Sequence, residues 1–252
     1  MEIIDSYAHC GIGKYRPIED VEQTINEAGV SRAVLVQHLG EYDNSYIERI
    51  VERQPERFAG VCLVDHGAPS AADTLHGLVD EGPFRGVRLT SDSLREGPGV
   101  WSAAADAGAV IVFFAPEGIA GSVDALRTFL EAHPECRMVV THLGNPDPRH
   151  APGFDEHRAL LELASFRGVY LQISGMEMFV PYPHEELYPL IADTAAAFGP
   201  SRLLWGSNYP VVGGTNEYRR ELDLLLERRL PVTQEAIPLA AGANARSLWF
   251  AA

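Results

Sequence analysis

Short apolar segments alternate with amphipathic segments along the whole chain. The apolar segments are rich in Val, Ile, Leu and Phe, which is typical of strands that are buried on both faces. The amphipathic segments carry apolar residues three or four positions apart, which predicts helices with one buried face. The pattern predicts eight strands: Met1–His9, Ala33–Val36, Phe58–Val64, Phe84–Leu89, Ala109–Ala115, Met138–Thr141, Val169–Ile173 and Leu203–Trp205.

A helix is predicted after each strand. The predicted helices are Glu19–Ala28, Ser45–Arg53, Ala71–Glu81, Val100–Ala107, Ser122–His133, Glu156–Ser165, Glu185–Phe198 and Tyr218–Arg228, with a further C-terminal helix at Gln234–Ala241. Strands that alternate with helices imply a parallel sheet with right-handed crossovers. Eight such units in 252 residues match the size of a (β/α)₈ TIM barrel. A doubly wound open sheet is the rival, but it usually has fewer strands, and the chain has no Gly-rich dinucleotide fingerprint.

The composition limits the domain organisation and the partners. No Pro/Gly/Ser-rich linker divides the chain, so we expect residues 1–252 to form a single α/β domain with extra C-terminal helices. The 20 Lys and Arg against 35 Asp and Glu give a net charge of −15, which disfavours nucleic acid and anionic membranes. The apolar runs are too short to cross a bilayer, and no signal peptide is evident. Three scattered cysteines fit a reducing cytoplasm, where we expect the protein to reside.

Polar residues gather where the predicted strands end. In a TIM barrel the carboxyl ends of the strands surround the active site. Asp5, Tyr7 and His9 occupy alternate positions of the first strand, so we expect their side chains to point the same way. The other strand ends contribute Gln37, His38, Asp65, His66, Arg88, Phe113, Phe114, Thr141, His142, Gln172, Ser174, Ser207, Asn208 and Tyr209.

Four histidines at strand ends favour a functional site over four isolated structural residues. These are His9, His38, His66 and His142. The other five histidines fall on predicted helices or loops and are expected at the surface: His76, His133, His150, His157 and His184.

Three further features have roles that the sequence leaves open. Arg88 either binds a substrate carboxylate or lactone oxygen through its fork of N–H donors, or pairs with Asp5 or Asp65 to hold the barrel. Glu177 is a general base if its loop folds inward, but an exposed loop acid is the reading that we favour. The Pro-rich run 146–153 is a loop after the sixth strand that is long enough to cover the site as a lid.

An ordered set of short motifs resembles a known family. The chain carries Ile4-Asp5-x-x-x-His9, Asp43-Asn44, Gly86-Val87-Arg88-Leu89, Thr141-His142-Leu143-Gly144, Ser174-Gly175 and Trp205-Gly206-Ser207-Asn208-Tyr209-Pro210. This series resembles the amidohydrolase-related family of the amidohydrolase superfamily. The resemblance implies a (β/α)₈ barrel and an activity among sugar lactonases, carboxylate lactonases and aromatic-acid decarboxylases. Many members use one divalent metal, usually zinc, and some lactonases work without metal.

Two residues depart from the pattern that the resemblance implies. The family carries Asp-x-His-x-His on the first strand and an aspartate on the eighth, whereas this chain has Tyr7 and Asn208 at those places. His9 and His142 are the only ordinary metal ligands that remain from the motif, and a tight zinc site needs at least three protein ligands. We therefore expect no bound catalytic metal. The alternative is one divalent metal such as zinc, held by His9 and His142.

The sequence therefore predicts a metal-independent, lactonase-like hydrolase acting on a small oxygenated or carboxylated substrate. His142 or His9 is expected to act as general base, Tyr7 to donate to the oxyanion or leaving oxygen, and Asn208 and Arg88 to supply further donors. The expected substrate-binding residues are His38, Arg88, Gln172 and Tyr209.

Two alternatives and one partner question stay open. The barrel could catalyse non-hydrolytic acid/base chemistry, such as decarboxylation, dehydration, isomerisation or cyclisation, with Tyr7 and His142 as the acid/base pair and Phe113, Phe114, Phe179 and Tyr209 shaping the cavity. A catalytically degenerate binding protein would also lose motif residues, but the replacements here are polar. Barrels of this kind often pair through helices and loops, so a homodimer is also considered.

Overall fold

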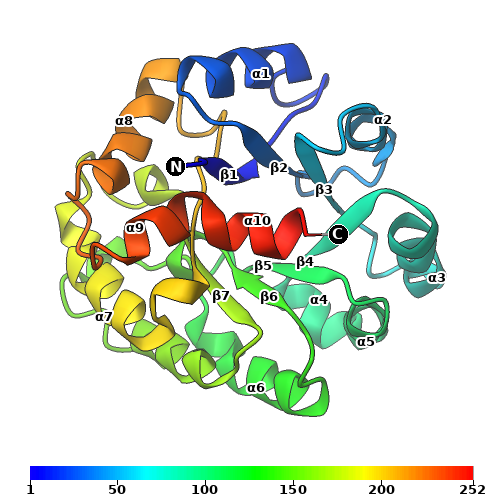
Figure 1. The fold of residues 1–252 in the computed structure, drawn as a ribbon. Helices are drawn as coiled ribbons and strands as arrows, with labels where there is room; N and C mark the ends of the chain where they lie inside the picture. The colour runs from blue at the N-terminus through cyan, green and yellow to red at the C-terminus, as the bar shows by residue number, and fades with distance from the viewer. Residues whose placement is uncertain (252) are drawn as a thin grey trace.

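Eight parallel strands form the centre of the computed structural model, which describes residues 1–251. The strands are hydrogen-bonded in the order of the sequence, so each pairs with the next. They curl into a nearly closed barrel that helices surround (Figure 1). The TIM-barrel prediction is therefore confirmed. The strands are β1 (Ile4–Ala8), β2 (Arg32–Val36), β3 (Phe58–Cys62), β4 (Phe84–Thr90), β5 (Val110–Phe114), β6 (Met138–Val140), β7 (Val169–Ile173) and β8 (Leu203–Trp205).

The α-helices cover the outside of the barrel, and the last of them crosses one end. They are α1 (Ile18–Glu27), α2 (Ser45–Arg53), α3 (Ala71–His76), α4 (Ser91–Glu96), α5 (Pro98–Asp106), α6 (Val123–Ala132), α7 (Tyr188–Phe198), α8 (Thr215–Leu226), α9 (Ala236–Pro238) and α10 (Asn244–Trp249). Other helical segments are of the 3₁₀ or π type. They lie at Gly77–Glu81, Ala120–Ser122, His142–Gly144, Pro148–His150, His157–Ser165, Met176–Met178, Glu185–Leu187, Pro200–Arg202 and Leu239–Ala243.

The apolar residues form two cores. One core lies between the strands and the helices, and Leu35 and Phe113 are among the strand residues that belong to it. The other fills the barrel itself, where alternate strand residues such as Val34, Val61 and Val112 point inward. Strands buried on both faces explain why the apolar runs of the sequence are nearly continuous.

Helix α10 closes the amino-terminal end of the barrel. It lies across the barrel in Figure 1, and its Ala245, Leu248 and Trp249 belong to the same core as Ile4 and Val34. Trp249 is buried, and its indole lies where a Cβ on Gly86 of β4 would touch it. The sequence pattern ended its last helix at Ala241 and therefore missed this element.

A bulge in β1 changes which side chains face the interior. Asp5 pairs with Ala33 but Ala8 pairs with Leu35, so β1 has one residue more than β2 across this stretch. Ile4 and Tyr7 consequently share the barrel interior, while the carboxylate of Asp5 accepts the hydroxyl of Tyr218 on α8. The expectation that Asp5 points the same way as Tyr7 was wrong for this reason.

Some helical segments differ from the prediction. Glu156–Ser165 was expected to be an α-helix, but His157–Ser165 is a run of 3₁₀ turns. The segment before α5 holds an additional helix, α4, whose first turn is capped by Thr90 and Ser93 through reciprocal side-chain bonds.

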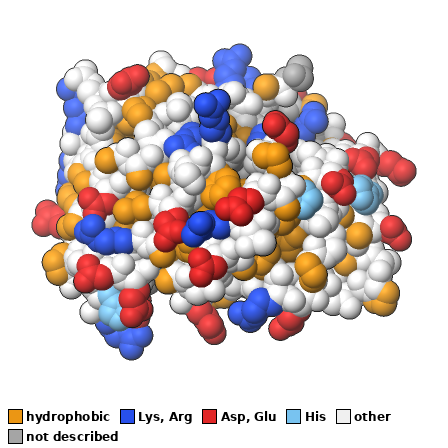
Figure 2. Space-filling view, turned by 90° about the horizontal axis from the view of Figure 1, so that it is seen from below, with side chains coloured by type: hydrophobic (Ala, Val, Ile, Leu, Met, Phe, Trp, Pro, Cys, Tyr) orange, Lys and Arg blue, Asp and Glu red, His pale blue; other side chains and the backbone are white. Residues whose placement is uncertain are grey.

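The surface carries charges of both signs. Acidic and basic side chains are interspersed on the face shown in Figure 2, without a continuous basic patch there. Within residues 1–251, none of the helices combines the length and apolar character needed to span a membrane.

Removing the Trp249 side chain tests whether α10 stabilises the barrel at its amino-terminal end. We expect Trp249→Ala to lower the free energy of unfolding by about 3–5 kcal/mol, because it leaves a cavity in the barrel core. Urea denaturation at constant pH measures the change. Ile12→Ala, at a side chain that is 78% exposed, is the control and should change stability by less than about 0.5 kcal/mol. A similarly small effect of Trp249→Ala would contradict the structural role of this helix.

Candidate active site

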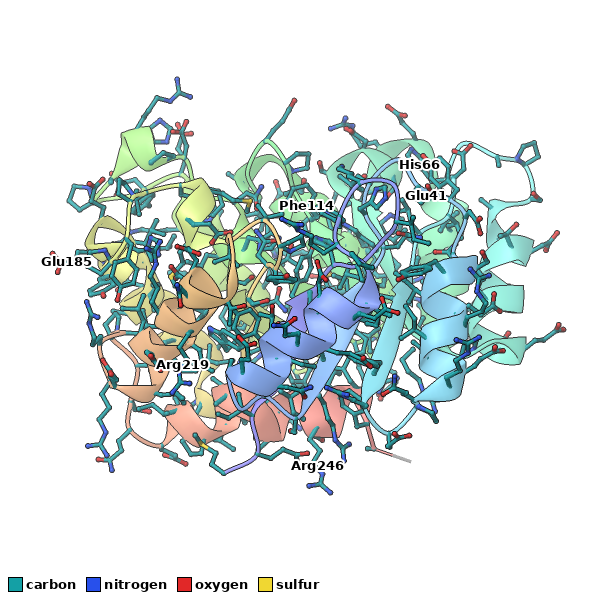
Figure 3. The ribbon with its side chains drawn as sticks, turned by 90° about the horizontal axis from the view of Figure 1, so that it is seen from above. Glu41, His66, Phe114, Glu185, Arg219 and Arg246 are labelled. Carbon is teal, nitrogen blue, oxygen red and sulfur yellow. The ribbon has the colours of Figure 1, made fainter. Side chains whose placement is uncertain are left out.

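The polar strand ends meet at the end of the barrel opposite α10. In Figure 3, Phe114, Glu41 and His66 mark this end, and Arg246 of α10 marks the other. At its centre the ring of Tyr7 contacts two imidazoles edge-on, with ring centroids 5.0 Å from His9 and 4.6 Å from His142. All three side chains are almost completely buried. The structure thus brings residues from β1 and from the end of β6 into one cluster.

Hydrogen bonds fix the orientation of His142. Gln172 Nε2 donates to the carbonyl oxygen of Ser6, so its Oε1 must accept from the Ser174 hydroxyl, at 3.1 Å. Ser174 Oγ has then used its only hydrogen, and at 2.8 Å it must accept from His142 Nδ1–H. The Nε2 of His142 therefore carries a free lone pair.

His9 is held in the same tautomer. Its Nδ1 lies 2.6 Å from the carbonyl oxygen of Val36, which can only accept a hydrogen bond. Its ring is covered by Tyr15, which stacks at a centroid distance of 4.7 Å with an interplanar angle of 7°. Tyr15 also meets His38 edge-on at 5.3 Å, so His38 lies at the rim of the same site. The segment that covers His9 is thus the loop after β1, whereas the lid expected at 146–153 stays a prediction.

Burial keeps the central groups uncharged. It lowers the pKa of His142 to about 3, with a further contribution from the positive charge of Arg88. It also holds the pKa of His9 well below its ordinary value, again with Arg88 adding to the effect. Burial raises the pKa of Tyr7, so its phenol stays protonated. The site therefore combines two neutral imidazoles with a phenol that can donate a hydrogen bond.

Arg88 brings a buried positive charge into this neutral site. Its guanidinium lies 4.8 Å from the ring centroid of Phe114 and 6.0 Å from that of Tyr7, and its Nη1 donates to the carbonyl oxygen of Gln37. Within residues 1–251 no carboxylate lies close enough to pair with it, so the suggested pairing with Asp5 or Asp65 was wrong. Its Nε and the hydroxyl of Tyr7 are both buried without a hydrogen-bond partner in the described chain.

Asn208 connects β1 to the chain that follows β8. It adopts a left-handed backbone conformation (φ 58°), which asparagine tolerates better than most residues, and its N–H donates to the carbonyl oxygen of Tyr7. Its side-chain amide donates to Glu177 Oε1 at 2.8 Å. Glu177 is therefore folded inward and half-buried, and the favoured reading of an exposed loop acid was wrong.

Two residues expected to bind substrate have other contacts. Gln172 uses its amide to hold Ser6 and Ser174, and through Ser174 it positions His142. The ring of Tyr209 packs against Tyr218 of α8, and its carbonyl oxygen accepts the N–H of His9. These contacts give both residues a structural role, and their roles in substrate binding stay predictions. Phe113 packs against Trp101 on the outer side of the barrel, and it is Phe114 that meets His142.

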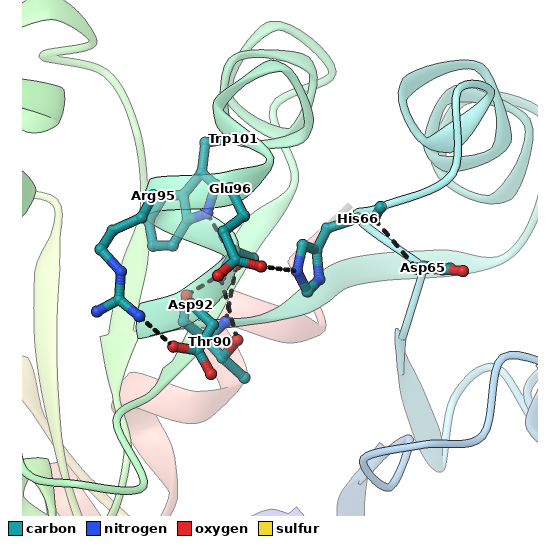
Figure 4. A network of polar contacts seen from close by, with 9 residues as sticks. Asp65, His66, Thr90, Asp92, Arg95, Glu96 and Trp101 are labelled. Atoms are coloured by element: carbon teal, nitrogen blue, oxygen red, sulfur yellow. Dashed lines mark hydrogen bonds and ion pairs between the residues drawn. The ribbon is translucent and has the colours of Figure 1, made fainter.

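His66 belongs to a separate network beside the mouth. Figure 4 shows it next to Glu96 of α4, with a separation of 3.9 Å between Nε2 and Oε2. Asp65 accepts the N–H of Gly67, which keeps it in its own turn. His66 and Arg88 line a common small cavity of about 60 Å³, so His66 flanks the site without joining the central cluster.

Two histidines that were expected at the surface are buried. His157 Nε2–H donates to the carbonyl oxygen of Leu143, which fixes the chain after His142. His184 lies between the carbonyl oxygen of Val180 and the carboxylate of Glu221, with its side chain fully buried. Their positions, His157 on a predicted helix and His184 on a predicted loop, gave no sign of burial, because the partners Leu143 and Glu221 determine it.

The donor set does not fit a tightly bound divalent metal. The ring of Tyr7 contacts both imidazoles, Asn208 offers no negative charge, and Arg88 places a cation nearby. Zinc prefers at least three imidazole, thiolate or carboxylate ligands. Within residues 1–251 no three His, Cys, Asp or Glu side chains are grouped so that they could hold a metal ion.

The loop residue Tyr15 was not predicted as part of the site, and for Glu177 the inward course was the reading that we did not favour. Tyr15 lies in a Gly-rich loop directly after the first strand, and an aromatic residue so close to a site strand was the available signal. For Glu177 the available signal was the turn Ser174-Gly175 that precedes it. The direction of the Glu177 side chain, however, depends on the backbone conformation of Gly175.

A barrel with polar groups buried at the carboxyl ends of its strands defines an enzyme-type TIM barrel. The Amidohydrolase family model matches residues 13–251, which is most of the chain. The chain belongs to this family of the amidohydrolase superfamily, which confirms the resemblance and makes the protein a hydrolase of that superfamily.

Individual relatives show how far the similarity reaches. The chain is 30% identical over 203 residues to an L-fucono-1,5-lactonase of Burkholderia ambifaria, covering 77% of this chain and 69% of the relative. It is 25% identical over 211 residues to a 4-sulfomuconolactone hydrolase of Rhizobium radiobacter, covering 78% and 67%. An amidohydrolase of Burkholderia multivorans, solved with bound zinc, has the same fold with a TM-score of 0.77 at 18% identity, and the match covers 100% of both chains.

The neutral state of His142 predicts how stability depends on pH. In the unfolded chain a histidine takes up a proton below about pH 6.5, whereas folded His142 stays neutral down to a pKa of about 3. Unfolding therefore takes up a proton in this window, and acidification favours the unfolded state. His142→Asn removes this titration, and asparagine tolerates the positive φ of 52° at this position.

We expect the stability loss between pH 7 and pH 5 to be about 2 kcal/mol smaller in His142→Asn than in the wild type. Urea unfolding of both proteins at the two pH values measures this difference. His150→Asn, at an exposed position, is the control and should keep the wild-type pH dependence. An identical pH dependence in all three proteins would show that His142 is not held neutral by the fold.

Proposed function

We propose that the protein is a metal-independent lactonase that hydrolyses a small cyclic ester carrying a carboxylate or several hydroxyl groups. The observation that carries this proposal is the buried guanidinium of Arg88, which lacks a carboxylate partner in the described chain and lies over the ring of Tyr7. A buried cation is costly unless a partner compensates it. An anionic or oxygen-rich substrate would supply that partner.

The relatives support the class of substrate. The two curated relatives act on lactones, as their names state, and one of those lactones carries a sulfonate group. A Pseudomonas putida protein assigned as 2-pyrone-4,6-dicarboxylic acid hydrolase shares the fold, with a TM-score of 0.79 at 22% identity and coverage of 98% and 97%. A cyclic ester with an acidic or hydroxylated ring therefore fits both the relatives and Arg88.

In the proposed reaction, hydrogen-bond donors of the site stabilise the negative charge that develops on the substrate. When water attacks the ester carbon, the carbonyl oxygen becomes an oxyanion. The hydroxyl of Tyr7 donates to it, and the free Nε–H of Arg88 supplies a second donor or binds the ring carboxylate. The free Nε2 atoms of His142 and His9 accept hydrogen bonds from the water or from ring hydroxyls. With a pKa of about 3, His142 is a weak proton acceptor near neutral pH.

Access to the site needs movement of the covering residues. Tyr7, His9, His142 and Asn208 are each at most 2% exposed, and Tyr15 stacks over His9. His38 lines a cavity of about 220 Å³ beside the loop that carries Tyr15, and Arg88 lines the smaller cavity near His66. A substrate entering between these cavities would displace Tyr15 and meet His38 and Arg88 first. Closing over the substrate would then exclude bulk water.

A hydrolysis assay tests the proposed class of reaction. We expect the purified protein to open at least one lactone in a panel of hydroxylated sugar lactones and carboxylated or sulfonated muconolactones. Treatment with a chelator should change the rate by less than about twofold, because no step passes through a metal. A pH indicator follows acid release, and mass spectrometry identifies the product, since hydrolysis adds one water. Activity that a chelator removes and zinc restores would contradict metal independence, and a product without added water would indicate non-hydrolytic chemistry.

Substitution of Arg88 tests the proposed anion contact. We expect Arg88→Met to lower kcat/KM for a carboxylated lactone by about 10- to 100-fold, because a hydrogen bond to a charged group contributes about 1.5–3 kcal/mol. The effect on an uncharged lactone should be smaller. Arg85→Met, at an exposed position of the same strand, is the matched control and should leave both rates unchanged. Equal losses on charged and uncharged lactones would contradict a carboxylate-binding role.

A further inference from the structure

The turn after β7 directs a carboxylate into the site. Gly175 has a left-handed conformation (φ 63°), and the 3₁₀ turn Met176–Met178 follows it directly. A Cβ added at Gly175 would lie 2.6 Å from His142 Nδ1, so the backbone of this turn is pressed against the imidazole. Any residue other than glycine would push the turn away. Glu177 lies two residues after Gly175, within the turn that packs on His142.

Asn208, in the segment after β8, holds the side chain of Glu177 by a hydrogen bond. Its amide Nδ2 donates to Glu177 Oε1 at 2.8 Å, and its backbone N–H donates to the carbonyl oxygen of Tyr7. One residue thus links the Glu177 carboxylate to the backbone of the proposed oxyanion donor. Asn208 cannot itself accept a proton, but as a neutral donor it leaves the bound carboxylate able to do so.

The groups around Glu177 make it a stronger proton acceptor than an ordinary glutamate. Burial raises its pKa, the hydrogen bond from Asn208 opposes this, and the negative charge of Glu221 raises the pKa further while His184 lowers it. Glu221 and His184 form their own buried pair behind the turn. His142, on which the turn packs, stays neutral and adds no charge.

We propose that Glu177 is the general base of the hydrolysis, and this assignment rests on the proposed lactonase function. Glu177 takes a proton from water while the water oxygen forms a bond to the ester carbon, and the carbonyl π electrons move onto the oxyanion beside Tyr7. The intermediate then collapses: the bond from the carbon to the ring oxygen breaks, and that oxygen takes the proton from Glu177. The hydroxy acid product releases its own proton to solvent, and Glu177 is again a carboxylate.

The assignment also gives the Asn208 position a role. A carboxylate at position 208 would lie within hydrogen-bonding distance of Glu177, and two carboxylates that close cannot both be ionised. The amide instead donates to the base and orients it. The acidic group of the site therefore comes from the turn after β7 and not from the segment after β8.

Kinetics of Glu177 variants test the proposal. We expect Glu177→Gln to lower kcat by about 10²- to 10⁴-fold with little change in KM, because it removes proton transfer and keeps the shape and the contact to Asn208. The acid-side fall of the wild-type kcat/KM profile should disappear in this variant, since it reports protonation of Glu177. Glu185→Gln removes an exposed carboxylate from the same connection and is the matched control, with wild-type rates expected (Figure 3).

A rescue experiment separates chemistry from structure. We expect formate to restore part of the activity of Glu177→Ala, because a small carboxylate can enter the space that the substitution leaves. If Glu177→Gln does not fold, as shown by circular dichroism, the rescue of Glu177→Ala and the rate of Glu177→Asp, expected at least about tenfold below wild type, decide the question.

The outcomes distinguish this assignment from the function on which it rests. A wild-type protein that opens no lactone overturns both. A wild-type protein that is active, with Glu177→Gln within twofold of its rate, overturns only the assignment of Glu177. The same holds if the variant is slow but keeps the acid-side fall and formate has no effect, since those results would give Glu177 a structural role.

Discussion

The closure of the barrel between β1 and the chain after β8 is the constraint on which the site depends. The carboxylate of Asp5 accepts the N–H and hydroxyl of Ser207 and the hydroxyl of Tyr218. Burial raises the pKa of Asp5 to about 6, and these donors oppose the rise. Two backbone bonds continue the closure, from Asn208 to Tyr7 and from His9 to Tyr209. Because the strands are short, these contacts decide where the residues of β1 stand relative to Asn208, and thus where the donors and the base of the proposed reaction meet.

The site is built by placing neutral and charged groups in a space that water does not reach. Two imidazoles have their Nδ1 atoms occupied by protein acceptors, so both present the same type of lone pair. The aromatic faces of Phe114 and Tyr7 stabilise the guanidinium of Arg88 without neutralising it. A ligand that brings negative charge gains more here than it would at the surface, because the low dielectric strengthens the attraction.

The fold followed from the sequence because it depends on local patterns. Every predicted strand exists, and the strand ends correctly predicted that Tyr7, His9, His142 and Arg88 are neighbours. What the pattern missed depends on contacts between distant segments. The bulge at Asp5 is a property of pairing with β2, the burial of His184 requires Glu221, and the inward course of Glu177 requires a glycine whose φ cannot be read from its identity. Helix α10 was missed because its apolar residues are few and its neighbours are Gly and Ala rich.

Helix α10 also has a consequence for the order in which the protein can fold. The interior of the barrel is lined by β1 and sealed by Leu248 and Trp249 of α10, two elements that lie far apart in the sequence. Until α10 docks, the apolar residues that point into the barrel stay uncovered at this end. Such surfaces attract chaperones and promote aggregation when they stay exposed. The yield of folded protein should thus depend on how quickly α10 docks, more than on the stability of any single β/α unit.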